Sequence, residues 1–178
     1  VAALPAAFGL QGERDRREPI IVQSLLKQVP GVRKVALDKL YAAGLNSLAM
    51  YAMAKPYDIV EATGLSREVA ARIVERFERY REDVAELTPD AARSREHAQL
   101  AELGRRLAEL NEDFELASHD RSPGAAAEKR RLRSERSEVI LQVDVLLARL
   151  GEVALVERLE RLPFHGKVAA LDGYLAEA

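Results

Sequence analysis

Two short turns in this sequence combine a glycine between apolar residues with basic residues at the start of the helical segment that follows. The first, Val-Pro-Gly-Val at 29–32, precedes Arg33 and Lys34, and the second, Ala-Thr-Gly-Leu at 62–65, precedes Ser66 and Arg67. Backbone N–H groups at a helix N-terminus lack partners within the helix and lie at the positive end of its dipole. They therefore bind anions such as phosphate. The chemistry that these turns predict is noncovalent binding of an anion.

The charge distribution favours the same half of the chain. The 178 residues carry a net charge of −2, which by itself argues against a dedicated nucleic-acid binder. Residues 19–81 hold ten Lys/Arg against six Asp/Glu, a local excess of +4 that leaves −6 for the rest of the chain. A mildly basic segment is thus joined to an acidic one. The alternative interpretation is that this excess is ordinary solvated charge on helix surfaces.

Signals for catalysis, metal binding and membrane insertion are missing from the sequence. There is no cysteine, which excludes disulfides and thiolate metal sites. The three histidines, His97, His119 and His165, are scattered, and the acidic residues alternate with Arg at helical spacing, as on a salt-bridged surface. No apolar run approaches the ~20 residues of a membrane span. We expect a non-enzymatic cytoplasmic protein with no metal site, no cofactor and no membrane contact.

Apolar periodicity and helix-breaking residues predict an all-α protein. We expect residues 1–18 to form a flexible N-terminal extension, because the segment begins rich in alanine and ends in a charged cluster before Pro19. Residues 19–87 are predicted to form a first domain of several short helices, divided by Pro30-Gly31, Gly44, Pro56 and Gly64.

The remaining residues, 88–178, are predicted to form an antiparallel helical hairpin followed by two short helices. The first long helix, from Pro89 to about 117, and the second, 125–150, carry apolar residues at heptad spacing around a turn at 119–124. The apolar seam on the first helix is Leu100, Leu103, Leu107, Leu110 and Phe114, and on the second it is Val139, Val143, Leu146 and Leu150. The charged stretch 128–138 is predicted to be solvent-exposed, with contact to nucleic acid as the alternative.

The first domain resembles the tandem helix-hairpin-helix domain found at the N-terminus of archaeal recombinases and in the C-terminal domain of the RNA polymerase α subunit. The resemblance covers about sixty residues and is carried by Gly31, Ala43-Gly44, Met53-Ala54, Gly64-Leu65-Ser66 and Ala70. It implies that the hairpin amides and nearby basic side chains grip the DNA backbone without reading its sequence. The residues to which this role transfers are Gly31, Val32, Arg33, Lys34, Gly64, Leu65, Ser66 and Arg67.

This sequence departs from the family pattern at two positions. DNA-binding members carry Gly-x-Gly in the hairpin, whereas Arg33 and Ser66 stand at the second glycine position here. Side chains at these positions either add phosphate contacts or block close approach of the backbone. In the second case Gly31 and Gly64 serve only to allow positive φ angles in a small helical domain.

Two functional hypotheses follow from the sequence. The first is a sequence-independent duplex DNA-binding protein whose helical body, 88–178, binds a protein partner or a second copy of the chain. The alternative is a protein–protein interaction adaptor or scaffold that uses both parts to bind partner proteins. A basic face spanning both turns favours DNA binding, and an exposed apolar groove favours the adaptor.

Overall fold

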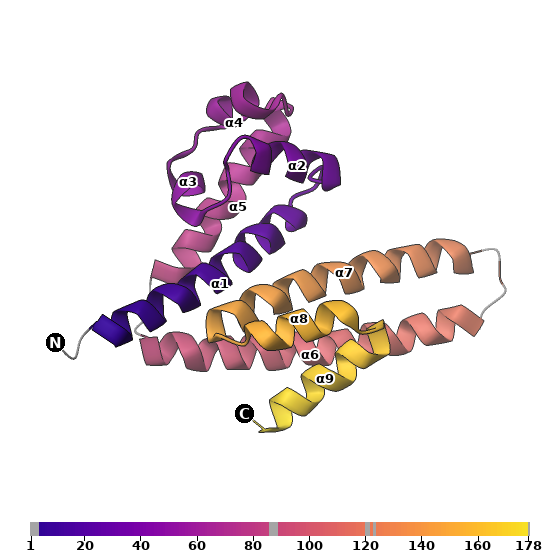
Figure 1. The fold of residues 1–178 in the computed structure, drawn as a ribbon. Coiled ribbons are helices and arrows are strands. Elements are labelled where there is room, and N and C mark those ends of the chain that lie inside the picture. The colour runs from indigo at the N-terminus through magenta and orange to yellow at the C-terminus, as the bar shows by residue number, and fades with distance from the viewer. Residues whose placement is uncertain (1–3, 86–88, 120–121, 123, 178) are drawn as a thin grey trace. The chain divides into compact units, whose positions relative to one another are not determined.

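The computed structural model describes residues 4–85, 89–119, 122 and 124–177, and every regular element in these residues is a helix (Figure 1). The all-α prediction is therefore confirmed. The chain divides into two compact units, Val1–Ala92 and Arg93–Ala178, whereas the sequence placed the boundary at residue 88. Among the helices described, none has both the length and the apolar content to cross a membrane.

The first unit contains five helices: α1 (Leu4–Gln28), α2 (Lys34–Ala42), α3 (Leu48–Met53), α4 (Pro56–Thr63) and α5 (Arg67–Ala85). The second contains α6 (Pro89–His119), whose first four residues are assigned to the first unit, α7 (Ala125–Leu150), α8 (Val153–Arg161) and α9 (Phe164–Glu177). The predicted start of α6 at Thr88 and the middle of the turn between α6 and α7, at 120, 121 and 123, lie outside the described residues.

The N-terminal extension expected at 1–18 is helical from Leu4 onward, because α1 runs without interruption to Gln28. Arg, Glu and Gln between 11 and 18 have high helix propensity, and they outweigh the one backbone N–H that Pro19 removes. The Glu18 carboxylate also accepts a hydrogen bond from the Leu48 N–H at 2.7 Å, at the start of α3. Residue 18 therefore belongs to the folded unit rather than to a tail.

Each helix of the first unit contributes a fully buried side chain to one core. Leu25, Leu40, Tyr51, Ile59 and Ile73 are all buried to within 1% of full burial. The Tyr51 ring stacks on Phe77 with centroids 4.1 Å apart, and its hydroxyl donates to the Leu45 carbonyl at 2.9 Å. Burial raises the pKa of Tyr51, so the hydroxyl remains protonated and keeps this hydrogen bond at neutral pH.

Helices α6 and α7 of the second unit run antiparallel (Figure 1). Near the start of α6, Glu96 forms an ion pair with Arg149 near the end of α7. Further along, Arg106 of α6 pairs with Glu135 of α7 at 3.2 Å. Six residues of the predicted seam are buried: Leu100, Leu107, Leu110, Val139, Val143 and Leu146. The other three, Leu103, Phe114 and Leu150, are half-buried.

The two C-terminal helices pack on this hairpin. Val156 and Leu159 of α8 and Leu171 of α9 are buried. A Cβ at Gly104 of α6 would lie 2.9 Å from Leu175 Cδ1 of α9, so glycine allows the close approach of these two helices. The C-terminal helices therefore complete the core that the two long helices begin.

The prediction that the charged stretch 128–138 is solvent-exposed holds only in part. Arg136 is buried, with its guanidinium carbon 3.7 Å from the ring centroid of Phe114 and 3.9 Å from that of Phe164. Its Nη1 donates to the Asn111 side-chain oxygen at 3.4 Å, and burial lowers its pKa. Arg136 therefore connects α6, α7 and α9 through its flat faces.

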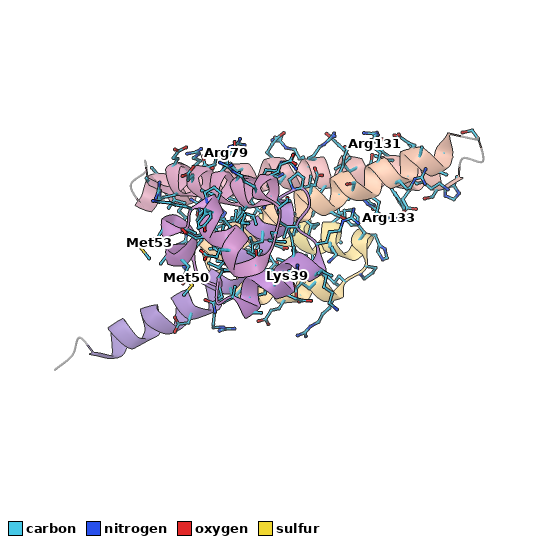
Figure 2. All side chains as sticks on the ribbon, turned by 90° about the horizontal axis from the view of Figure 1, so that it is seen from above. Lys39, Met50, Met53, Arg79, Arg131 and Arg133 are labelled. Atoms are coloured by element: carbon cyan, nitrogen blue, oxygen red, sulfur yellow. The ribbon has the colours of Figure 1, made fainter. Side chains whose placement is uncertain are left out.

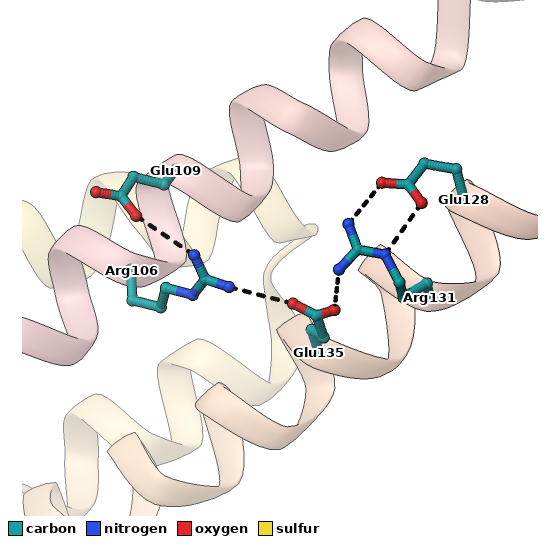
Figure 3. Close-up of polar contacts among 5 residues, drawn as sticks. All are labelled: Arg106, Glu109, Glu128, Arg131 and Glu135. Carbon is teal, nitrogen blue, oxygen red and sulfur yellow. Dashed lines mark hydrogen bonds and ion pairs between the residues drawn. The ribbon is translucent and has the colours of Figure 1, made fainter. Parts of the chain in front are cut away.

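Other charges of this stretch form a surface network between α6 and α7 (Figure 3). Arg131 donates to Glu128 at 3.0 Å and 2.5 Å and also pairs with Glu135, which is shared with Arg106. Exposed pairs of this kind add little to stability. They occupy Arg131, whereas Arg130 of the same stretch is exposed and has no ion pair among the described residues, so the nucleic-acid alternative for this stretch stays a prediction.

We predict that Leu107→Ala will lower the free energy of unfolding of the second unit by ~2–5 kcal/mol, because it removes buried methyl groups and leaves a cavity. Leu116→Ala is the matched control, because Leu116 is 72% exposed on the same helix, and it should cost no more than about 0.5 kcal/mol. Urea unfolding followed by circular dichroism measures both changes. Equal stability of the two variants would contradict the buried seam. A loss that depends on protein concentration would show that the seam closes a dimer.

Candidate nucleic-acid interface

Both glycine turns of the first unit have backbone angles that favour glycine, and the first turn packs on α5. Gly31 and Gly64 have φ angles of 93° and 66°, in the region that favours glycine. A Cβ on Gly31 would lie 3.0 Å from Cγ2 of Val69, in the first turn of α5. The first glycine turn thus packs on the beginning of the helix that follows the second glycine turn.

The eight predicted site residues divide into an exposed set and an anchoring pair. The exposed set is Gly31, Arg33, Lys34, Gly64, Ser66 and Arg67. Val32 is buried and Leu65 is half-buried, so their side chains fix the turns in the core and do not face solvent.

Hydrogen bonds within the protein already occupy the backbone amides of the second turn. The Gly64 N–H donates to the Val60 carbonyl at 2.8 Å, and the Leu65 N–H donates to the Thr63 hydroxyl at 3.2 Å. The Ser66 hydroxyl accepts from the Val69 N–H at 3.3 Å and caps α5. The amides of Gly64 and Leu65, which the resemblance implies as phosphate donors, are therefore committed to the turn itself.

The first turn leaves more of its donors open. The Val32 N–H donates to the Val29 carbonyl at 3.0 Å, so this amide is also committed. Arg33 occupies the cap position of α2, and its side chain accepts no hydrogen bond, as expected of a guanidinium. Within the described part of the chain, the amides of Lys34, Val35 and Ala36 therefore have no acceptor.

A groove of about 410 Å³ lies beside this first turn, between α1 and α2. Three exposed cations line it, Lys27 from α1 and Arg33 and Lys34 from the start of α2, with Asp38 as the one carboxylate. Burial raises the pKa of Tyr41, which also lines the groove, so this hydroxyl adds no negative charge. The sequence identified Lys27 only as one of ten basic residues, because its place in the groove depends on how α1 packs on α2.

Several other basic residues of this unit are occupied by neighbours. Arg72 pairs with Glu68 at 2.6 Å, and Arg79 pairs with Glu75. Arg76 donates to the Gln28 side-chain oxygen at 3.0 Å and 2.8 Å, and burial lowers its pKa. In contrast, the side chains of Lys27, Arg33, Lys34 and Arg67 form no ion pair within the described residues. Lys39, Lys55 and Arg81 are also exposed and have no ion pair among the described residues. The first turn is distinguished from these positions because three such cations line one groove.

A second surface of the first unit is apolar. A groove of about 640 Å³ is bounded by α1, α3 and α5 and lined in part by Leu48, Ala52, Phe77 and Val84. Met50 and Met53 project from α3, and Met53 is 79% exposed (Figure 2). This groove is the feature that the adaptor hypothesis requires.

No group of three or more metal-binding side chains comes together among the described residues. The centroid of the His97 ring lies 6.4 Å from that of Tyr174. His119 is exposed at the end of the same helix, and His165 is exposed on α9. The open amides and cations of the first turn are groups that can bind an anion, and the described part of the chain holds no group of side chains that suggests another chemistry.

Comparison with known proteins adds no further constraint: no protein-family model, no curated protein and no solved structure matches this chain. The functional argument therefore depends on the residues and geometry described above.

Proposed function

We propose that the first unit is a tandem helix-hairpin-helix domain and that the protein is a non-enzymatic, sequence-independent duplex DNA-binding protein. The observation that supports this proposal is the packing of the positive-φ Gly31 on Val69, in the first turn of the helix that follows the positive-φ Gly64. Each turn opens a helix with an exposed cation, Arg33 and Lys34 at the first and Arg67 at the second.

The proposed contacts are to phosphate because the available groups are donors and cations. Ammonium and guanidinium groups bind phosphate oxygens, and uncapped amides at the start of α2 add donors of the same kind. Phosphates occur at every nucleotide and carry no direct information on base sequence, so binding through them is sequence-independent. The second unit would then bind a protein partner or a second copy of the chain.

The apolar groove between α1, α3 and α5 favours a second candidate, a protein–protein interaction adaptor. An exposed apolar surface with few charges is typical of a site that docks another protein. Three charged residues, Asp15, Glu18 and Arg81, stand at this groove, and most of the rest of its lining is apolar. Under this hypothesis the glycine turns serve only to hold the helices together.

We predict that the protein binds a random-sequence duplex weakly and with strong salt dependence. Three phosphate contacts give a slope of about −2.7 in a plot of log affinity against log salt, or roughly a 40-fold loss between ~50 and ~200 mM salt. The triple variant Arg33→Glu, Lys34→Glu, Arg67→Glu should abolish binding while circular dichroism stays unchanged. Fluorescence anisotropy with a labelled duplex measures the binding of the parent and of the variant.

The charge-matched control for this experiment is Arg95→Glu, Arg130→Glu, Arg158→Glu, which alters three exposed cations of the second unit. It should bind DNA within about twofold of the parent at the same salt. Equal loss in the two triple variants would show that net charge, and not the glycine turns, determines binding. No binding by the parent at ~50 mM salt would remove the DNA proposal and leave the adaptor.

For the adaptor we predict that the apolar groove is open to small apolar probes. The fluorescence of an anilinonaphthalene sulfonate dye should rise on binding the parent, and Ala52→Glu should suppress that rise by placing a charge in the groove. Ala71→Glu is the matched control, because Ala71 is exposed on α5 and does not line the groove. Suppression by both variants, or no enhancement with the parent, would contradict an accessible docking groove.

A further inference from the structure

The two glycine turns are unequal as anion sites. In the second turn, the amides of Gly64 and Leu65 are bonded within the chain, and Ser66 caps α5 through the Val69 amide. The Thr63 hydroxyl that holds Leu65 is buried and donates in turn to the Ile59 carbonyl at 2.6 Å. At the start of α5 the amides of Arg67 and Glu68 have no acceptor among the described residues. The second turn therefore offers one open helix amide fewer than the first, where Lys34, Val35 and Ala36 are open.

The first turn also has more exposed cations than the second. Three exposed cations from two helices, Lys27, Arg33 and Lys34, line the groove beside the first turn. The second turn contributes Arg67 alone, and the Glu68 that follows it is paired with Arg72 at 2.6 Å. Since electrostatic attraction adds over nearby charges, the first groove has the stronger potential for an anion.

We propose that a single nucleic-acid strand binds in the groove lined by Lys27, Arg33 and Lys34, held through its phosphates, and that the second turn, which has one cation, mainly supports this site. This inference rests on the proposed DNA-binding function. The support is physical: the capped first turn of α5 holds Val69 against Gly31 and thereby fixes the first turn. Arg67 makes one outlying contact.

A site that grips one strand does not require the second strand. The protein should therefore bind single-stranded and duplex DNA of the same length with similar affinity, and the two should compete for the same site. A site that used both turns equally would contact two strands, or two separated points on the duplex, and would prefer the duplex.

The experiment measures Kd by fluorescence anisotropy for a labelled random-sequence 20-nucleotide single strand and for its duplex, both at ~50 mM salt. We expect the two values to agree within about threefold. Lys27→Glu should weaken both complexes about tenfold, whereas Arg67→Glu should weaken them about threefold, because Lys27 lines the groove and Arg67 is not part of its lining. Lys39→Glu is the control: Lys39 is exposed on α2 outside the groove and should change Kd less than twofold.

The outcomes separate this inference from the proposed function. Binding of duplex alone, with equal losses for Lys27→Glu and Arg67→Glu, would overturn the single-strand site and keep DNA binding through both turns. No binding of either DNA would overturn both. Circular dichroism of each variant controls for folding, and Lys27→Gln should give an intermediate loss if the Lys27 charge acts directly on phosphate.

Discussion

The first unit depends on the close contact between Gly31 and Val69. A side chain at residue 31 would meet Val69 Cγ2 at 3.0 Å, and the φ angle of 93° already strains any residue other than glycine. Glycine satisfies both conditions at once, so the turn after α1 packs directly on the beginning of α5. That contact joins the turn between α1 and α2 to the first turn of α5.

The starts of α5 and α2 differ in capping: a cap stabilises a helix, whereas an uncapped helix start keeps N–H donors free for a ligand. The Ser66 hydroxyl caps α5, and a cap of this kind typically contributes about 1 kcal/mol. The start of α2 lacks such a cap, because Arg33 cannot accept a hydrogen bond. The unit thus forgoes stabilisation at the helix whose N-terminus is surrounded by cations. A residue that caps α2 would stabilise it and at the same time use up the donors that we assign to phosphate.

The sequence predicted the features that depend on local chemistry. Helix periodicity gave the all-α class and the apolar seam of α6 and α7, and glycine between apolar residues located the turns at Gly31 and Gly64. The tandem hairpin arrangement and the role of these turns in binding stay predictions, and their tests are binding experiments.

Features that the sequence missed depend on contacts between distant segments. In the sequence, Glu18 belongs to a charged cluster. In the structure its carboxylate accepts a hydrogen bond from the Leu48 amide, thirty residues away. Arg136 lies in a stretch that is otherwise charged and exposed, and only the packing of Phe114 and Phe164 buries it. The commitment of the Leu65 amide depends on the rotamer of Thr63, which no periodicity encodes.

The burial of the apolar seam also constrains how the second unit can bind a partner. Leu100, Leu107, Leu110 and Val143 are covered within one chain, with α8 and α9 completing the core. Among the described residues of this unit, Leu116 is the one large apolar side chain with most of its surface exposed. Self-association through an apolar seam would therefore require α8 and α9 to leave the hairpin, which would also break the stacking of Arg136 on Phe164.

With the helices in place, a partner of this unit meets a surface of paired charges such as Arg106, Glu135 and Arg131. Binding there must replace existing ion pairs, so its net gain per contact is small and falls with salt.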